Sequence, residues 1–131
     1  MSTRDGTVYS FAVLRAVPHV HLGAFCNVGV VLYAPTTAFL SLRVLDDVAE
    51  LRRRLPDADV ELLARYLVAC RAVCEGDESA GPVALAAPSE RFHWLTAPRS
   101  DVLQASPVHE GVGEPALALD ELYAAFVEPH R

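Results

Sequence analysis

The chain has 131 residues, of which 52% are hydrophobic and 21% charged, and its formal net charge is −6. This length and composition predict one globular domain, residues 1–131, with a single hydrophobic core, and they argue against disorder. The acidic balance argues against binding to nucleic acid or to an anionic membrane surface. The opening residues lack the apolar core of a signal peptide, and no apolar run reaches the roughly 18 residues of a membrane span, so we expect a cytoplasmic protein.

Three strands are predicted near the start of the chain, at residues 8–17, 25–33 and 38–45, because these segments are rich in Val, Leu and aromatic residues. The connections between them are short, which favours antiparallel neighbours. A fourth strand is expected late, at about residues 101–106, and a loop is expected at 107–114.

Helices are predicted after the third strand. Asp47 followed by Glu50 resembles a capping box for a short helix. A longer helix at about residues 59–75 carries a broad apolar face and ends at Gly76. On its opposite face, Glu61 and Arg65 are spaced for an i,i+4 ion pair.

Two further helices are expected in the second half of the chain. Ser89 would cap a short helix to Leu95, and Pro115 would begin the last helix. Together these elements predict an α+β fold: an antiparallel sheet of three consecutive strands plus a late fourth strand, with two to three helices packed on one face.

A polar cluster is expected on one face of the sheet. A hairpin centred near His21 pairs Arg15 with Asn27 and Val13 with Gly29, and a turn near Thr36 pairs Gly29 with Arg43. Strand alternation then gathers Arg15, Asn27, Gly29 and Arg43 on one face, which could bind an anionic ligand or a peptide. Leu14, Val30 and Leu42 would lie on the opposite face, beneath the helices. The alternative is an ordinary solvated sheet face, on which arginine stems cover aromatic rings.

The three cysteines, Cys26, Cys70 and Cys74, are expected to be free thiols in a reducing compartment. Cys70 and Cys74 lie one turn apart in an apolar helical stripe, where cysteine is usually a small hydrophobic residue. We therefore expect no metal site and no cofactor. Cys26 as a nucleophile beside His93 is an alternative, although Cys26 falls on the apolar face of its strand.

Several segments resemble the bacterial family of domain of unknown function 3037. These segments are Tyr9-x-x-x-Val13-Leu14-Arg15-x-x-Pro18, Gly23-x-Phe25-x-Asn27-Val28-Gly29-Val30-Val31-Leu32, the run 89–100 (SERFHWLTAPRS), and Ser106-Pro107-Val108-His109-x-Gly111. The resemblance covers nearly the whole chain and implies no known activity. Members are often encoded beside HipA-like kinases, which implies a protein partner.

The run 89–100 and the segment after it supply a second candidate site, made of His93, Arg99 and His109. Arginine grips carboxylate or phosphate, and histidine exchanges protons near neutral pH. If the three side chains gather, they could bind an anionic group or act on it. The alternative is that the run is structural, with Phe92 and Trp94 packed in the core.

Three hypotheses for function follow from these patterns. The first is an accessory or binding module that acts with a protein partner, such as a HipA-like kinase. The second is a small enzyme acting on a phosphate- or carboxylate-bearing ligand, with His93 as acid/base and Arg99 as clamp. The third is a homodimer with a structural role. A pocket in which Arg15, Arg99 and His109 converge would favour binding of a ligand.

Overall fold

The computed structural model describes residues 6–19, 24–97 and 102–128. This part of the chain contains five strands, which are β1 (Val8–His19), β2 (Ala24–Ala34), β3 (Phe39–Val44), β4 (Leu103–Ala105) and β5 (His109–Val112). It also contains four α-helices, which are α1 (Val48–Arg54), α2 (Val60–Glu75), α3 (Pro88–Thr96) and α4 (Pro115–Phe126). Short 3₁₀ turns lie at η3 (Pro35–Thr37), η4 (Glu78–Ala80) and η5 (Pro82–Leu85).

The strands form one antiparallel sheet in the order β3-β2-β1-β4, and β5 also pairs with β1. This confirms the predicted α+β class and the late fourth strand. The segment predicted as a loop contains β5, so that prediction was wrong. The four residues of β5 are mostly exposed and show no alternation of apolar side chains, so they carry little sequence signal for a strand. Pairing with β1 makes this segment a strand.

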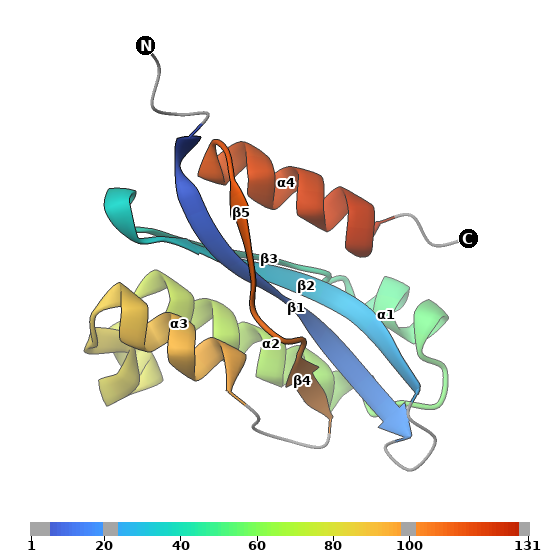
Figure 1. The fold of residues 1–131 in the computed structure, drawn as a ribbon. Helices are drawn as coiled ribbons and strands as arrows, with labels where there is room; N and C mark the ends of the chain where they lie inside the picture. The colour runs from blue at the N-terminus through green and yellow to red at the C-terminus, as the bar shows by residue number, and fades with distance from the viewer. Residues whose placement is uncertain (1–5, 20–23, 98–101, 129–131) are drawn as a thin grey trace.

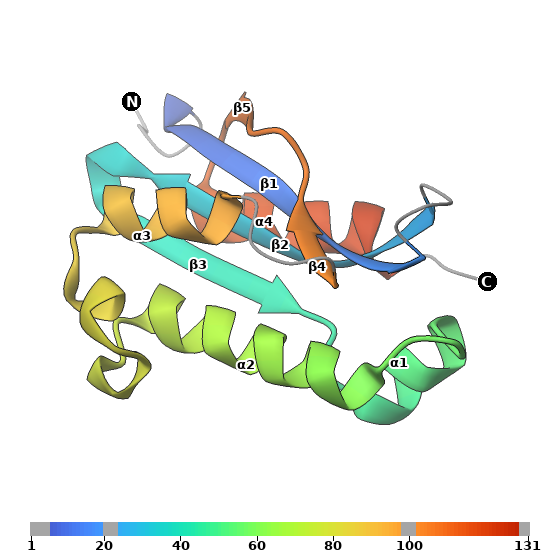
Figure 2. The same ribbon diagram turned by 90° about the horizontal axis from the view of Figure 1, so that it is seen from below.

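Helices cover both faces of the sheet (Figures 1 and 2). The helices α1, α2 and α3 pack on one face, as predicted, around a core that includes Leu14, Val28, Leu51, Leu63, Leu67 and Phe92. The last helix, α4, packs on the other face, mainly over β2 and β3. Its core includes Val30, Leu32, Leu119, Tyr123 and Val127. The face predicted to be open is therefore partly covered by α4.

The predicted register holds at one position and is shifted beyond it. Arg15 pairs with Asn27, as predicted, but a bulge next to this pair makes Leu14 the partner of Gly29. The extra residue is Val28, which is fully buried. A bulge inserts one residue in one strand and so reverses the faces of the residues after it.

Val30 and Gly29 are among the residues that therefore lie on faces opposite to those predicted. Val30 pairs with Val13 and with Arg43, and it packs under α4 rather than under α1–α3. Gly29 pairs with Val44 and has the side chains of Leu14 and Val44 beside it, so it leaves the predicted polar cluster. Leu14 and Leu42 do lie on the face beneath α1–α3, as predicted.

The helix ends follow local rules with two corrections. Asp47 and Asp59 cap α1 and α2, and Gly76 ends α2 in a left-handed conformation, as predicted. No capping box forms at α1, because Glu50 bonds to Arg53 and Arg54 instead of reaching back to the cap. The short helix α3 begins at Pro88, one residue before the predicted cap Ser89.

The predicted ion pair between Glu61 and Arg65 is absent from the described structure. Glu61 pairs instead with Arg52 of α1, with 2.9 Å between Nη2 and Oε2. The two helices pack against each other, so the tertiary contact replaces the local one. None of the described helices is both long enough and apolar enough to cross a membrane.

Candidate functional site

A pocket of about 280 Å³ lies on the face of the sheet that carries α4. Its floor comes from alternate residues of β1 and β2, and its sides come from the end of α4 and from the segment that leads into β5. The lining residues are Phe11, Val13, Arg15, Phe25, Asn27, Ser106, His109, Glu110 and Phe126. We call this the Arg15 pocket. It brings Arg15, Asn27 and His109 together from among the predicted site residues.

Arg15 is the only cation among the lining residues. Its guanidinium carbon lies 4.3 Å from the centre of the Phe25 ring, a cation–π contact. Its Nε is buried without a hydrogen-bond partner, and no ion pair joins its guanidinium to a residue in the described ranges. The charge of Arg15 is therefore held at the pocket by an aromatic ring and is not neutralised by a carboxylate there.

Asn27 links the pocket to the end of α4. Its Nδ2 donates to the carbonyl oxygen of Phe126 at 3.1 Å, which fixes the orientation of the amide because a carbonyl can only accept. Its Oδ1 is buried and unpartnered in the described structure. Asn27 thus holds the aromatic wall at Phe126 and leaves an acceptor beside Arg15, its partner across the two strands.

The opposite side of the pocket is built around a break between β4 and β5. Ser106 is buried, and its Oγ accepts from the backbone N–H of Val13 at 2.9 Å while it donates to the carbonyl of Pro107. The hydrogen bond from Val13 to Ser106 satisfies the backbone of β1 between β4 and β5, where strand pairing is interrupted. His109 then stacks on Phe11, with 5.5 Å between ring centres, and its side chain remains exposed.

Arg43 lies on the same sheet face as Arg15 and Asn27, as predicted, but it is engaged by α4. Its Nη1 lies 3.0 Å from Oδ1 of Asp120, and its guanidinium carbon lies 4.3 Å from the centre of the Tyr123 ring. Arg43 is not among the residues that line the Arg15 pocket. Its contacts in the structure attach α4 to β3.

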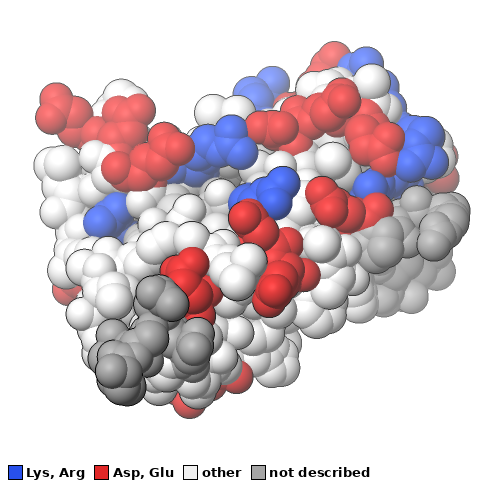
Figure 3. Space-filling model, turned by 90° about the horizontal axis from the view of Figure 1, so that it is seen from above, with Lys and Arg blue, Asp and Glu red and all other residues white. Residues whose placement is uncertain are grey.

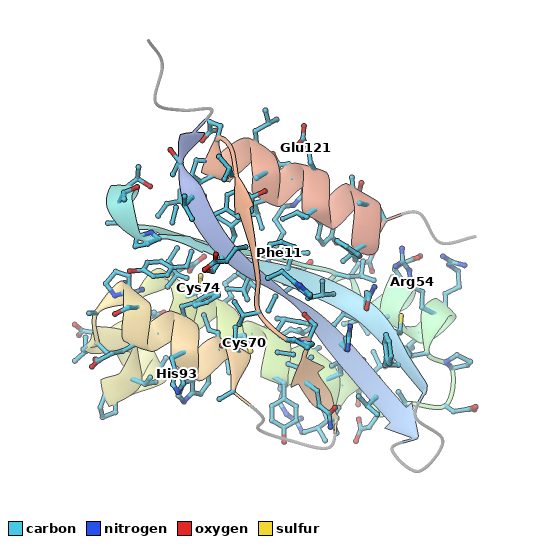
Figure 4. All side chains as sticks on the ribbon, viewed as in Figure 1. Phe11, Arg54, Cys70, Cys74, His93 and Glu121 are labelled. Atoms are coloured by element: carbon cyan, nitrogen blue, oxygen red, sulfur yellow. The ribbon has the colours of Figure 1, made fainter. Side chains whose placement is uncertain are left out.

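The structure does not bring His93 and His109 together. His93 is exposed on α3, in the helical layer that covers the other face of the sheet from α4 (Figure 4). His109 lies beside Phe11 on the α4 side. Arg99, the third member of that candidate site, lies outside the described residues. Whether His93 or Arg99 takes part in function stays a prediction.

None of the three cysteines forms a disulfide in the described structure. Burial raises the pKa of the Cys74 thiol to about 12, and it also raises the pKa of Cys26, although Arg54 opposes the shift. Cys70 and Cys74 lie between α2 and the sheet (Figure 4). A thiol with a raised pKa is a poor nucleophile, so the environment of Cys26 gives no support to the nucleophile alternative. Within the described ranges, no three His, Cys, Asp or Glu residues gather in a way that could hold a metal ion.

The comparison with protein families decides the classification of the chain. A family model described as "Protein of unknown function (DUF3037)" matches residues 11–127. The chain belongs to this family. No curated protein and no solved structure gives a significant match to the chain.

The geometry gives structural roles to two residues of the run 89–100, Arg91 and Phe92. Arg91 donates to the carbonyl oxygens of Cys74 at 2.7 Å and of Ala86 at 3.0 Å, and so it closes the end of α2. Phe92 packs against Tyr33 across the helix–sheet interface. The run 89–100 is thus structural at these two positions.

Sequence reasoning placed Phe11 and Phe25 on the face of Arg15 but missed the contribution of Phe126 to the Arg15 pocket. Phe126, at the end of α4, is 39% exposed and borders the pocket. Ser106 belongs to a segment shared with DUF3037, which was the available signal for its role. Segments that are far apart in the sequence meet at this pocket, so only the tertiary structure shows it.

Proposed function

We propose that this member of DUF3037 is a binding module that acts with a protein partner, and that the Arg15 pocket holds a carboxylate of that partner. The unneutralised guanidinium of Arg15 is the observation that carries the proposal. Arginine binds carboxylates through paired N–H donors, and a cation held on an aromatic ring loses little freedom when it does so. The family resemblance makes a HipA-like kinase the partner to test first.

The charges around the pocket favour a single carboxylate over a phosphate. Glu110 also lines the pocket, so one cation and one anion face the ligand. Figure 3 shows further acidic side chains over the face that α4 forms, and α4 itself carries the exposed residues Asp120 and Glu121. A doubly charged phosphate would meet more repulsion there than a carboxylate would. An acidic side chain or a chain terminus of the partner therefore fits best.

The aromatic side chains favour a ligand that is part of a larger apolar segment. Phe11, Phe25 and Phe126 border the cation, and Phe25 is 53% exposed. Burial of aromatic surface, with an arginine at the centre, is typical of the residues that dominate protein interfaces. A free small anion could use Arg15 but would leave these rings in water.

The test is a calorimetric titration of the full chain with a HipA-like kinase. Arg15→Ala should weaken binding by at least tenfold, and Arg15→Lys should restore it only in part, because lysine lacks the paired donors. Arg52→Ala is the matched control, since Arg52 is an exposed arginine of α1 whose partner, Glu61, lies on α2.

Titration with acetate and with inorganic phosphate, followed by NMR, separates the sources of the anion. Binding of acetate alone at Arg15, without the kinase, would indicate a small anionic ligand instead of a protein segment. Equal affinity of Arg15→Ala and wild-type protein for the kinase, or no binding of the kinase, would overturn the proposal. The enzyme hypothesis, with His93 and Arg99, is tested separately by His93→Ala and Arg99→Ala in an activity screen.

A further inference from the structure

The outward face of α2 carries a regular seam of residues on the side of the helix away from the core. The seam consists of Glu61, Arg65, Val68, Ala72 and Glu75. The intervals alternate between four and three residues, which is the spacing along which two helices meet in a coiled coil. Val68, at the centre, is 65% exposed, although burial of a valine side chain is energetically favourable.

A groove of about 600 Å³ runs along this seam. Its floor is formed by small and apolar side chains, including Ala64, Ala69 and Ala72, and its far wall includes Ala80 and Trp94. Small residues allow the backbone of another helix to approach closely. The groove therefore has the shape and the composition to receive a helix.

Two residues of the seam, Arg65 and Glu75, carry opposite charges and make no ion pair within the described structure. Arg65 lines the groove and makes no ion pair with a described residue. Its neighbour along the helix, Glu61, pairs with Arg52 instead. Glu75 is exposed near the other end and makes no ion pair with a described residue. Ten residues separate the two charges, about 15 Å along the helix. The seam is thus positive at one point and negative at another, with Val68 and Ala72 between them.

We propose that a second copy of the chain occupies this groove, with the two α2 helices packed antiparallel about a two-fold axis. In this arrangement Arg65 faces Glu75 of the partner subunit, and Val68 faces Ala72 of the partner subunit. Each contact then occurs twice, as an isologous interface requires. A parallel arrangement would place Arg65 beside its own copy, so the charges select the antiparallel one.

The proposal is independent of the Arg15 pocket, whose residues come from β1, β2, α4, β5 and the segment that leads into β5. Because α2 has 16 residues, one helix face and its walls make a small interface. We therefore expect a reversible dimer whose population rises with protein concentration. The Arg15 pocket of each subunit would remain accessible in this dimer.

Sedimentation equilibrium of the full chain over a wide range of concentration tests the dimer. Arg65→Glu and Glu75→Arg should each raise the dissociation constant by roughly tenfold or more, because each places like charges together twice. An equimolar mixture of the two variants should dimerise again. In the mixed dimer, each substituted residue faces an opposite charge. A parallel pairing would show the same rescue, but there each single variant would only exchange one like-charged pair for another, so weakening by the single variants is what identifies the antiparallel pairing.

The matched control is Glu121→Arg, which makes the same change of charge on α4, where the side chain points away from the molecule (Figure 4). It should leave the dissociation constant unchanged. Val68→Asp should abolish the dimer, and thermal melts monitored by circular dichroism should show all variants folded. A monomer at every concentration, or a mixture of variants that fails to dimerise, would overturn the proposal. A dimer that none of the seam variants affects would do the same.

Discussion

Gly29 in β2 lies so close to Val44 in β3 that an added β-carbon would be 2.8 Å from Cγ1 of Val44. The same β-carbon would be 3.0 Å from the backbone carbonyl oxygen of Arg43. The glycine follows the bulged residue Val28, where the register between β1 and β2 changes. Space, rather than an unusual backbone conformation, is the reason that this position needs glycine.

Gly29→Ala should therefore lower the free energy of unfolding by about 1–3 kcal/mol, because the new methyl group meets backbone as well as a side chain. Urea denaturation of both proteins measures the difference. Gly6→Ala is the control, since nothing lies within 4 Å of the added β-carbon there. Equal losses in the two variants would show that the close approach to Val44 does not matter.

Arg91→Ala should destabilise the protein by about 2 kcal/mol. The substitution leaves the carbonyl oxygens of Cys74 and Ala86 without their charged donor at the end of α2. Differential scanning calorimetry measures the change. Arg52→Ala, which removes only an exposed ion pair, should cost less than about 1 kcal/mol. A loss for Arg91→Ala as small as that of the control would contradict the structural role.

Ser106→Ala should cost about 1–3 kcal/mol, because it leaves the buried N–H of Val13 without an acceptor. Hydrogen exchange at the Val13 amide should become faster, since its hydrogen bond is lost. Ser89→Ala is the matched control, as Ser89 is exposed and does not cap α3. Unchanged exchange at Val13 in the Ser106 variant would be evidence against the bond.

Stability should fall in acid through Glu50. Hydrogen bonds from Arg53, and then those from Arg54, lower the pKa of this carboxyl from 4.5 to about 2. A carboxyl with a lower pKa in the folded state stabilises the protein when ionised. Its contribution is complete above pH 4.5 and is lost as the pH falls toward 2.

Glu50→Gln removes this titration. The melting temperature of the wild type should exceed that of the variant near neutral pH, and the difference should shrink between the two pKa values and vanish in strong acid. Melting curves recorded over this range test the sign. A difference that stays constant with pH would exclude Glu50 as the source.

The thiols should react in a defined order. Burial raises the pKa of Cys74 to about 12, and Cys70 is also buried, so neither should react with a disulfide reagent in the folded protein. Cys26, which is half-buried, should react slowly and alone. Under denaturing conditions all three should titrate. Cys26→Ser should abolish the reaction of the folded protein and leave two thiols that titrate under denaturing conditions.

Local sequence patterns determined much of the fold. Short connections and apolar strands predicted three antiparallel neighbours, and Asp47, Asp59 and Gly76 marked helix ends because their side chains or backbone preferences act within one turn. Strand alternation also placed Arg15, Asn27 and Arg43 on one face, and their cross-strand and α4 contacts confirm it. These features depend on neighbours that are close in sequence.

Tertiary structure decided the rest. The bulge at Val28 depends on how β2 fits between β1 and β3, and it moved Val30 and Gly29 to faces that strict alternation did not predict. Glu61 pairs with Arg52 of α1 and not with Arg65. Arg43 pairs with Asp120 of α4. In both cases the packing of another element brought a competing charge within reach. Arg15 kept its charge unpaired because α4 ends beside it, at Phe126, and brings no carboxylate into contact with it. Packing of elements far apart in the chain, which no local pattern encodes, thus decided which arginine remains free for a ligand.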